Sequence, residues 1–219
     1  MSLNKTKGNM YPWTTHTWNP IKGKCPHECV YCYMNRFPQG GLRLDEKCLK
    51  DNLGKVNTIF VGSSTDMFAW SVLPDWILKV LNHCRNYPIN TYLFQSKNPH
   101  NMYKYEPVLP LNVIVGTTIE TNRPTSEISK APYPRTRLAW LDQFSGIPKM
   151  LSIEPIMDFD LDVFITCIKQ VKPSFVSIGA DSKNHGLPEP PAGKIREFIQ
   201  ELQKFTEVKV KANLKRLMK

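Results

Sequence analysis

Short apolar segments that alternate with longer segments of helical periodicity are the feature that most constrains this chain. The apolar segments lie at Asn57–Val61, Thr91–Phe94, Asn112–Val115, Lys149–Ile153 and Phe175–Ile178, with weaker candidates at Thr15–Pro20 and Glu207–Val210. Continuous apolar runs of this length are typical of strands that are buried on both faces, as in parallel sheets. We therefore expect a parallel sheet of six or seven strands.

The segments between these runs predict helices, at Pro74–Arg85, Pro134–Phe144, Asp160–Val171 and Pro191–Phe205. Strands that alternate with helices imply β–α units with right-handed crossovers. Six or seven units are too few for a closed eight-unit barrel of ~250 residues. We predict an α/β fold, a partial, open (β/α)6-type barrel with parallel strands. A doubly wound sheet is the second choice.

The length of 219 residues fits a single domain. Residues 1–14 are assigned to an N-terminal extension, and residues 207–219 to a basic C-terminal strand or tail. The sequence has no apolar stretch of signal-peptide or membrane-spanning length, so a cytoplasmic protein is expected. A formal net charge of +10 favours polyanionic partners, with DNA or RNA first.

Polar side chains follow five of the predicted strands, in the segments Gly62–Asp66, Gln95–Lys97, Gly116–Glu120, Glu154–Pro155 and Gly179–Asp181. A single polar residue in such a place is ordinarily a turn or helix-cap residue. The carboxyl ends of parallel strands meet at one edge of the sheet, where ligands of α/β folds bind. Recurrence after five strands therefore predicts one shared polar site.

Three of the six cysteines lie within eight residues, at Cys25, Cys29 and Cys32, with the spacing C-x3-C-x2-C. Thiolates are ligands both of zinc and of iron–sulfur clusters. Zinc normally takes four ligands, so His16 or His27 would have to complete a Cys3His site. On a 4Fe-4S cluster, three protein ligands leave one iron open to an external ligand. The motif alone leaves both metals open.

The remaining cysteines stand alone in the sequence. Cys84 and Cys167 fall on apolar helix faces and are predicted to be small core residues. Cys48 lies in a polar stretch, where it is either incidental or a redox partner.

Several aromatic residues also lie near the cysteine motif. They either stack on nucleic-acid bases or wall off a cofactor and fill the core; they are Trp13, Trp18, Tyr31, Tyr33 and Phe37.

A cysteine motif of this spacing after the first strand of a β–α repeat resembles the radical S-adenosylmethionine (SAM) superfamily. The residues Ser64–Asp66, Ser96–Lys97 and Thr118–Glu120 are similar to motifs of its spore photoproduct lyase branch. The sequence looks closer still to a phage- and prokaryote-associated family of uncharacterised radical SAM-like proteins. The motifs of that family correspond here to Val61–Asp66, Gly116–Glu120 and Ser152–Pro155. This resemblance extends from about Thr15 to the C-terminus.

The resemblance implies that Cys25, Cys29 and Cys32 hold a 4Fe-4S cluster, with Tyr31 as the aromatic residue before the last ligand. It also implies that the open iron binds SAM, and that one-electron reduction yields a 5′-deoxyadenosyl radical for hydrogen abstraction. By position, the remaining cofactor-binding residues would be Ser63, Ser64, Thr65, Asp66, Lys97, Thr118, Glu120 and Glu154.

Two positions of this sequence bear on the reaction. Tyr33 matches a tyrosine in the hydrogen-return path of the lyases and is the catalytic candidate. Ser64 stands where the repair lyases carry a cysteine, so thymine-dimer repair does not carry over. The glycine-rich motif of the wider superfamily is replaced by Gly62–Ser64.

These observations give three hypotheses. The first is a radical SAM enzyme that is reduced by flavodoxin or ferredoxin and whose candidate substrate is a nucleic acid. The second is a zinc-stabilised basic module that binds nucleic acid without catalysis. The third is a barrel that keeps the cluster but has no turnover. Metal content separates the first two, and SAM cleavage separates the first from the third.

Overall fold

Parallel strands form nearly all of an eight-stranded sheet with the order β1-β2-β5-β6-β7-β8-β9-β10. Every neighbouring pair from β2 to β10 is parallel, and β1 pairs antiparallel with β2 at one edge. The computed structural model describes residues 3–219. Its sheet strands are β1 (Leu3–Lys5), β2 (His16–Trp18), β5 (Thr58–Val61), β6 (Thr91–Gln95), β7 (Val113–Thr118), β8 (Lys149–Ile153), β9 (Phe175–Ile178) and β10 (Glu207–Val210).

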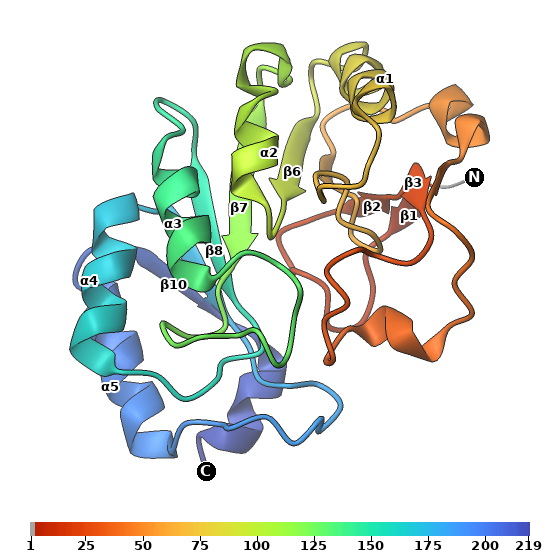
Figure 1. Ribbon diagram of the computed structural model, residues 1–219. Coiled ribbons are helices and arrows are strands. Elements are labelled where there is room, and N and C mark those ends of the chain that lie inside the picture. Colours follow the sequence, from red (N-terminus) through yellow and green to blue (C-terminus); the bar gives the residue numbers. More distant parts are fainter. Residues whose placement is uncertain (1–2) are drawn as a thin grey trace.

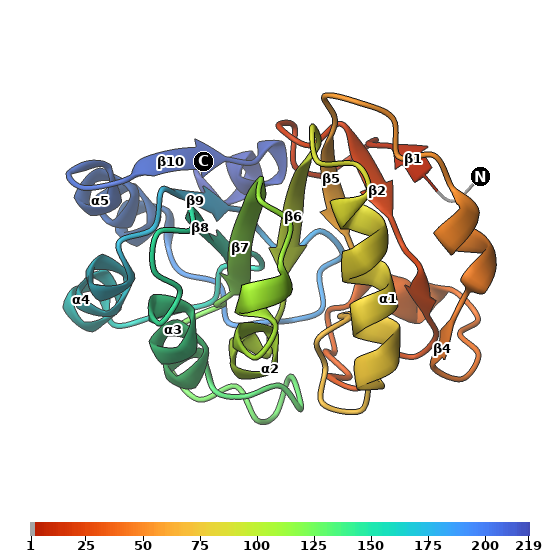
Figure 2. The same ribbon diagram turned by 90° about the horizontal axis from the view of Figure 1, so that it is seen from above.

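Helices connect the parallel strands along one side of the sheet (Figures 1 and 2). They are α1 (Pro74–Arg85), α2 (Pro99–Tyr103), α3 (Pro134–Asp142), α4 (Leu161–Val171) and α5 (Ala192–Gln203). Figure 2 shows the strands in an arc that has β1 and β10 near its two ends. The predicted partial, open (β/α) barrel is confirmed.

The structure adds elements that the sequence did not predict. Helix α2 is only five residues long, and β3 (Ile21–Lys22) pairs with β4 (Arg43–Leu44) in a separate antiparallel ladder. The 3₁₀ turns lie at Tyr33–Arg36, Glu46–Lys50, Glu106–Val108 and Ala212–Leu217. Elements this short carry no usable periodicity, because a period of 3.6 residues or of two needs several repeats.

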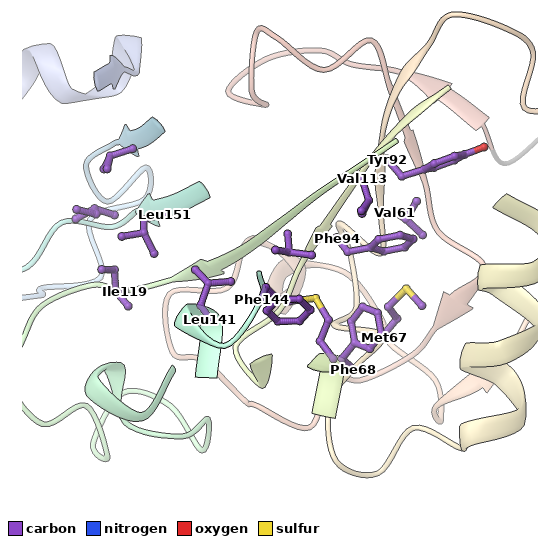
Figure 3. Close-up of a cluster of buried hydrophobic side chains, with 14 of the residues drawn as sticks. Val61, Met67, Phe68, Tyr92, Phe94, Val113, Ile119, Leu141, Phe144 and Leu151 are labelled. Carbon is purple, nitrogen blue, oxygen red and sulfur yellow. The ribbon is translucent and has the colours of Figure 1, made fainter. Parts of the chain in front are cut away.

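The outer face of the sheet packs against the helices. Successive strand side chains point to opposite faces, so Val61, Phe94 and Leu151 point outward from three parallel strands. Figure 3 shows them beside helix and loop residues such as Leu141 and Phe144. This layer makes one continuous core with all of the longer helices.

The inner face is filled largely by the N-terminal extension. Phe60, Leu93, Met150 and Phe175 point inward and cluster with Tyr11, and Met10 and Trp13 pack against the same cluster. The ring of Tyr11 stacks on Trp13 with centroids 5.3 Å apart. Both faces of the strands are therefore buried, which explains their continuous apolar runs.

None of the helices in residues 3–219 has the length and apolar content that crossing a membrane requires.

Candidate functional site

A cavity of about 540 Å³ lies at the carboxyl ends of the strands, where the polar strand ends meet. Every predicted site residue except Glu120 lines it. Those residues are Cys25, Cys29, Tyr31, Cys32, Tyr33, Ser63, Ser64, Thr65, Asp66, Lys97, Thr118 and Glu154. The structure thus brings the cysteine motif and the ends of separate strands together at one place.

Tight turns and a neighbouring segment hold the cysteine motif in place. The backbone N–H of Glu28 donates to Cys25 at 3.2 Å, and the N–H of Cys32 donates to Cys29 at 3.1 Å. The N–H of Val30 donates to the carbonyl of Ile128 at 2.9 Å, so the segment after β7 supports the motif from outside. The three cysteines are free thiols on one loop beside one cavity.

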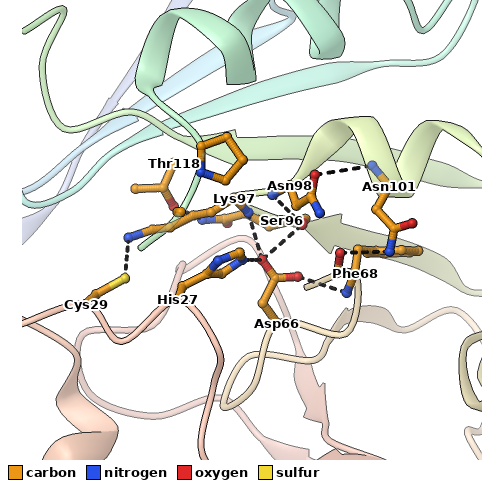
Figure 4. A network of polar contacts seen from close by, with 12 residues as sticks. His27, Cys29, Asp66, Phe68, Ser96, Lys97, Asn98, Asn101 and Thr118 are labelled. Carbon is orange, nitrogen blue, oxygen red and sulfur yellow. Dashed lines mark hydrogen bonds and ion pairs between the residues drawn. The ribbon is translucent and has the colours of Figure 1, made fainter. Parts of the chain in front are cut away.

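Lys97, which follows β6, connects the cysteine motif to a buried carboxylate. Its Nζ donates to Cys29 Sγ at 2.9 Å, as Figure 4 shows, and lies 2.9 Å from Glu120 Oε1. It also contacts the Tyr31 hydroxyl and lies 4.4 Å from the centre of the Tyr31 ring. A cation is therefore held against one thiol at the wall of the cavity.

Burial acts on the other two thiols. It raises the pKa of the Cys25 thiol to about 12, with the nearby Asp66 charge adding to the effect. Burial also raises the pKa of Cys32. A bound metal reverses this preference, because metal coordination stabilises the thiolate. The donor set of three thiols thus fits an iron–sulfur cluster, which takes cysteine thiolates as its ligands.

Glu120 lies behind the cavity wall and has no exposed surface. Its carboxylate accepts a hydrogen bond from Arg137 Nη1 at 2.9 Å and another from the Tyr31 hydroxyl. Arg137 belongs to α3, is also fully buried, and donates to the Thr118 carbonyl at 2.7 Å. Glu120 therefore organises Lys97 and Tyr31 from behind instead of facing the cavity.

Arg137 was missed by the reasoning from sequence. It stands at helical spacing with Leu138 and Leu141, on the side of α3 that packs inward. An arginine on the apolar face of a predicted helix was the available signal, because buried charges are almost always paired.

Asp66 ties three segments together. Its Oδ2 accepts from the backbone N–H of Lys97 at 2.8 Å and from Ser96 Oγ at 2.9 Å, and it lies 2.8 Å from His27 Nε2 (Figure 4). Its Oδ1 accepts from the N–H of Phe68 at 2.9 Å. Most of the acceptor capacity of this carboxylate is therefore used within the protein.

The histidines proposed for the zinc alternative have other partners. His27 is bound to Asp66, and His16 Nδ1 lies 2.9 Å from the Thr15 hydroxyl. In the described part of the chain, no three His, Cys, Asp or Glu side chains gather around a position for a single metal ion. The zinc-stabilised binding module is not favoured.

The far end of the cavity is built by β8, β10 and the N-terminal extension. Glu154 pairs with Lys211 Nζ at 2.7 Å and accepts from Asn9 Nδ2 at 3.0 Å. A Cβ at Gly179 would lie 2.9 Å from the Glu154 carboxyl carbon, so a larger residue there would displace the Glu154 side chain.

Tyr11 forms part of the wall between the two ends. Its hydroxyl lies within hydrogen-bond distance of Gln95 Oε1 at 2.9 Å and of Ser152 Oγ at 2.7 Å, and Gln95 Nε2 donates to Thr118 Oγ1 at 2.8 Å. Burial, with the charge of Glu154 adding to it, raises the pKa of the Tyr11 phenol. The N-terminal extension, for which the sequence predicted no structural role, thus contributes directly to the cavity wall.

The isolated cysteines lie outside the cavity lining. Cys84 is fully buried in the core, as predicted, and Cys167 is partly buried against it. Cys48 is also buried, although the sequence around it is polar.

Solved structures with a similar fold include a variant of spore photoproduct lyase, with a TM-score of 0.64 and 12% identity over 94% of this chain and 78% of that one. Another variant of this lyase, with bound AdoMet and dinucleoside spore photoproduct, has a TM-score of 0.58 and 13% identity over 91% and 64%. SuiB of Streptococcus suis bound to S-adenosylmethionine has a TM-score of 0.59 and 11% identity over 89% and 49%. These neighbours are radical SAM enzymes, and at identities this low the structural similarity shows a shared fold alone.

No curated protein matches the chain in sequence. The family described as a protein of unknown function, DUF5131, matches residues 9–182. The chain therefore belongs to the DUF5131 family.

Proposed function

We propose that this protein is a radical SAM enzyme whose cluster is held by Cys25, Cys29 and Cys32. The observation that carries the proposal is the cavity in which three free thiols of one loop face the polar ends of parallel strands. The fold shared with radical SAM enzymes supports it. The relation to the spore photoproduct lyase branch and the assignment of residues 1–219 to one catalytic domain are part of this proposal.

A 4Fe-4S cluster held by these thiols would pass one electron from the donor to SAM, whose sulfonium would then break into methionine and a 5′-deoxyadenosyl radical. The protein has to hold the cofactor beside the thiols and keep water away from it. Lys97 is the proposed partner of the SAM carboxylate, and the position of its ammonium beside Cys29 at the cavity wall supports this assignment. Tyr31, Ser63, Ser64, Thr65, Asp66, Thr118 and Glu154 line the same space and complete the proposed cofactor contacts.

The geometry divides these residues by role. Glu120 and Asp66 act mainly as positioning residues, since their carboxylates are occupied by protein donors. Tyr33 is the proposed catalytic residue for hydrogen return. Its hydroxyl donates to the Ser63 carbonyl at 3.1 Å, and its side chain is 42% exposed at the cavity. Ser64 offers no thiol for this step.

Nucleic acid is the proposed substrate class, and flavodoxin or ferredoxin in the cytoplasm is the proposed electron donor. The net charge of +10 supports a polyanionic substrate. One structural neighbour was solved with a dinucleoside spore photoproduct, which supports a nucleotide-sized ligand.

Iron and sulfide analysis of anaerobically reconstituted protein tests the cluster. We expect four irons and four sulfides per chain, and their loss in Cys29→Ala. Cys167→Ala is the matched control, because Cys167 lies on α4 away from the cavity and should leave the cluster intact. One zinc without labile sulfide would overturn the proposal in favour of the zinc module.

Incubation of the reduced, reconstituted protein with SAM tests turnover. The expected product is 5′-deoxyadenosine, above the level formed by Cys29→Ala. A normal cluster with no product above that control would favour the third hypothesis, a barrel without turnover.

A further inference from the structure

Three cations at the cavity have no acidic partner within the part of the chain that the structure describes. Lys7, Arg36 and Lys183 line the cavity, are exposed, and form no ion pair within residues 3–219. The two lysines deeper in the cavity differ, since Lys97 pairs with Glu120 and Lys211 with Glu154. The charges of Lys7, Arg36 and Lys183 are therefore not balanced by a carboxylate within the described residues.

The unpaired cations come from separate parts of the chain. Lys7 and Lys183 belong to segments that meet where Asn9 Nδ2 donates to Ser182 Oγ at 3.0 Å. Arg36 ends the 3₁₀ turn that follows Cys32. The carboxylates that line the cavity are already engaged, Asp66 by His27 and Asp181 by His185. Five lysine or arginine side chains line the cavity against three carboxylates, so cations outnumber carboxylates there.

The structure also sorts the aromatic residues near the cysteine motif. Trp18 is fully buried, Trp13 stacks on Tyr11, and the Tyr31 hydroxyl is bound to Glu120. Tyr33 and Phe37 remain, with 42% and 53% of their surface exposed. They flank Arg36, whose guanidinium carbon lies 5.9 Å from the centre of the Phe37 ring.

Exposed aromatic rings interleaved with cations are the arrangement that binds single strands, because bases stack on the rings while cations contact phosphates. A paired and stacked duplex offers no free base face to such rings. A cavity of about 540 Å³ is the size of a small-molecule site, and it also has to hold the proposed cofactor, so an unstacked base can reach its opening but a duplex cannot enter.

We propose that the cavity rim formed by Lys7, Tyr33, Arg36 and Lys183, together with Phe37 beside Arg36, binds a single-stranded polynucleotide and presents one unstacked base to the cavity. This proposal deepens the proposed function, because the strand would be the substrate of the same site. Binding itself requires neither cluster nor SAM and can be measured apart from them.

The test compares two variants of equal charge. The rim variant carries Lys7→Gln, Arg36→Gln and Lys183→Gln. The control carries Lys55→Gln, Arg85→Gln and Lys104→Gln, which are exposed, form no ion pair within residues 3–219, and precede β5, β6 and β7 at the opposite end of the barrel. Fluorescence anisotropy measures the affinity of each protein for single-stranded and duplex oligonucleotides against salt concentration, with DNA and RNA arms.

We expect wild type to bind single strands more tightly than duplexes. The slope of log affinity against log salt is negative and should become shallower by about 2 in the rim variant, because each phosphate contact to a single strand contributes about 0.7 to its magnitude. The control should keep the wild-type slope. Phe37→Ala should lower single-strand affinity about tenfold without changing the slope.

An equal loss of single-strand affinity in the rim and control variants would overturn the proposal, since the overall charge of the protein would then explain binding. Tighter binding of duplexes would overturn it as well. If wild type takes up no iron or sulfide yet binds single strands through the rim, the proposed function fails and this inference stands. If SAM is cleaved but the rim variant binds strands as wild type does, the inference fails alone.

Discussion

The Glu120 carboxylate lies 2.9 Å from the Arg137 guanidinium, and both side chains are completely excluded from solvent. Glu120 follows β7 and Arg137 belongs to α3, so this ion pair links the sheet to the helix layer behind the cavity. Glu120 also holds Lys97 and Tyr31, which contact each other at the cysteine motif. The Glu120–Arg137 ion pair thus fixes the residues that contact the cysteine motif from the side of the helices.

Replacement of Arg137 should destabilise the fold. In Arg137→Met, Glu120 loses one of its two cations while it stays buried, which we expect to cost about 3 kcal/mol. Urea unfolding of the variant checks this value. Arg135→Met is the matched control on the same helix, because Arg135 is exposed and should change stability by less than about 0.5 kcal/mol. Similar stability of both variants would contradict a supporting role for the pair.

The same pair predicts how stability depends on pH. Burial alone would raise the pKa of Glu120, but the charges of Lys97 and Arg137 outweigh it and lower the pKa from 4.5 to about 2. A carboxylate with a lowered pKa in the folded state stabilises the fold above pH 4.5, and this contribution disappears as the pH falls through about 2. The shift corresponds to about 3 kcal/mol.

We therefore expect the free energy of unfolding to fall less steeply in Glu120→Gln than in wild type between about pH 5 and about pH 2. The difference between the two proteins removes the contributions of the other carboxylates. Urea unfolding at several pH values in this range measures it. Parallel pH profiles would show that Glu120 titrates normally.

The parallel sheet could be predicted because its strands are buried on both faces and read as continuous apolar runs. Lys149–Ile153 and Phe175–Ile178 match their predicted bounds, and the polar strand ends meet as expected. The place of Tyr11 inside the barrel could not be predicted, because it depends on packing against residues up to Phe175. Arg137 was hidden for the same reason, since its partner Glu120 lies on another element.

Tyr11 gives a test of the N-terminal extension. Tyr11→Ala removes a buried ring from the inner cluster and its hydroxyl from Gln95 and Ser152, so we expect a loss of about 4 kcal/mol. Tyr11→Phe should lose only about 1 kcal/mol, because the ring remains. Thermal and urea unfolding measure both. Tyr133→Ala, at a tyrosine that is 54% exposed, should have little effect. A small effect of Tyr11→Ala would mean that the extension contributes little to the stability of the barrel.

Replacement of Gly179 tests how closely the end of β9 approaches Glu154 at the cavity. An alanine Cβ there would lie 2.9 Å from the Glu154 carboxyl, which pairs with Lys211, and 3.0 Å from Oδ1 of Asn213, whose Nδ2 donates to the Ala180 carbonyl. Because neither can move without breaking those bonds, Gly179→Ala should destabilise the protein by about 2 kcal/mol. Gly193→Ala is the matched control, since a Cβ at this position of α5 meets no atom within 4 Å. It should stabilise the helix by up to about 0.5 kcal/mol. Urea unfolding of the two variants should therefore shift in opposite directions, and an equal shift would show that the approach of β9 to Glu154 is not tight.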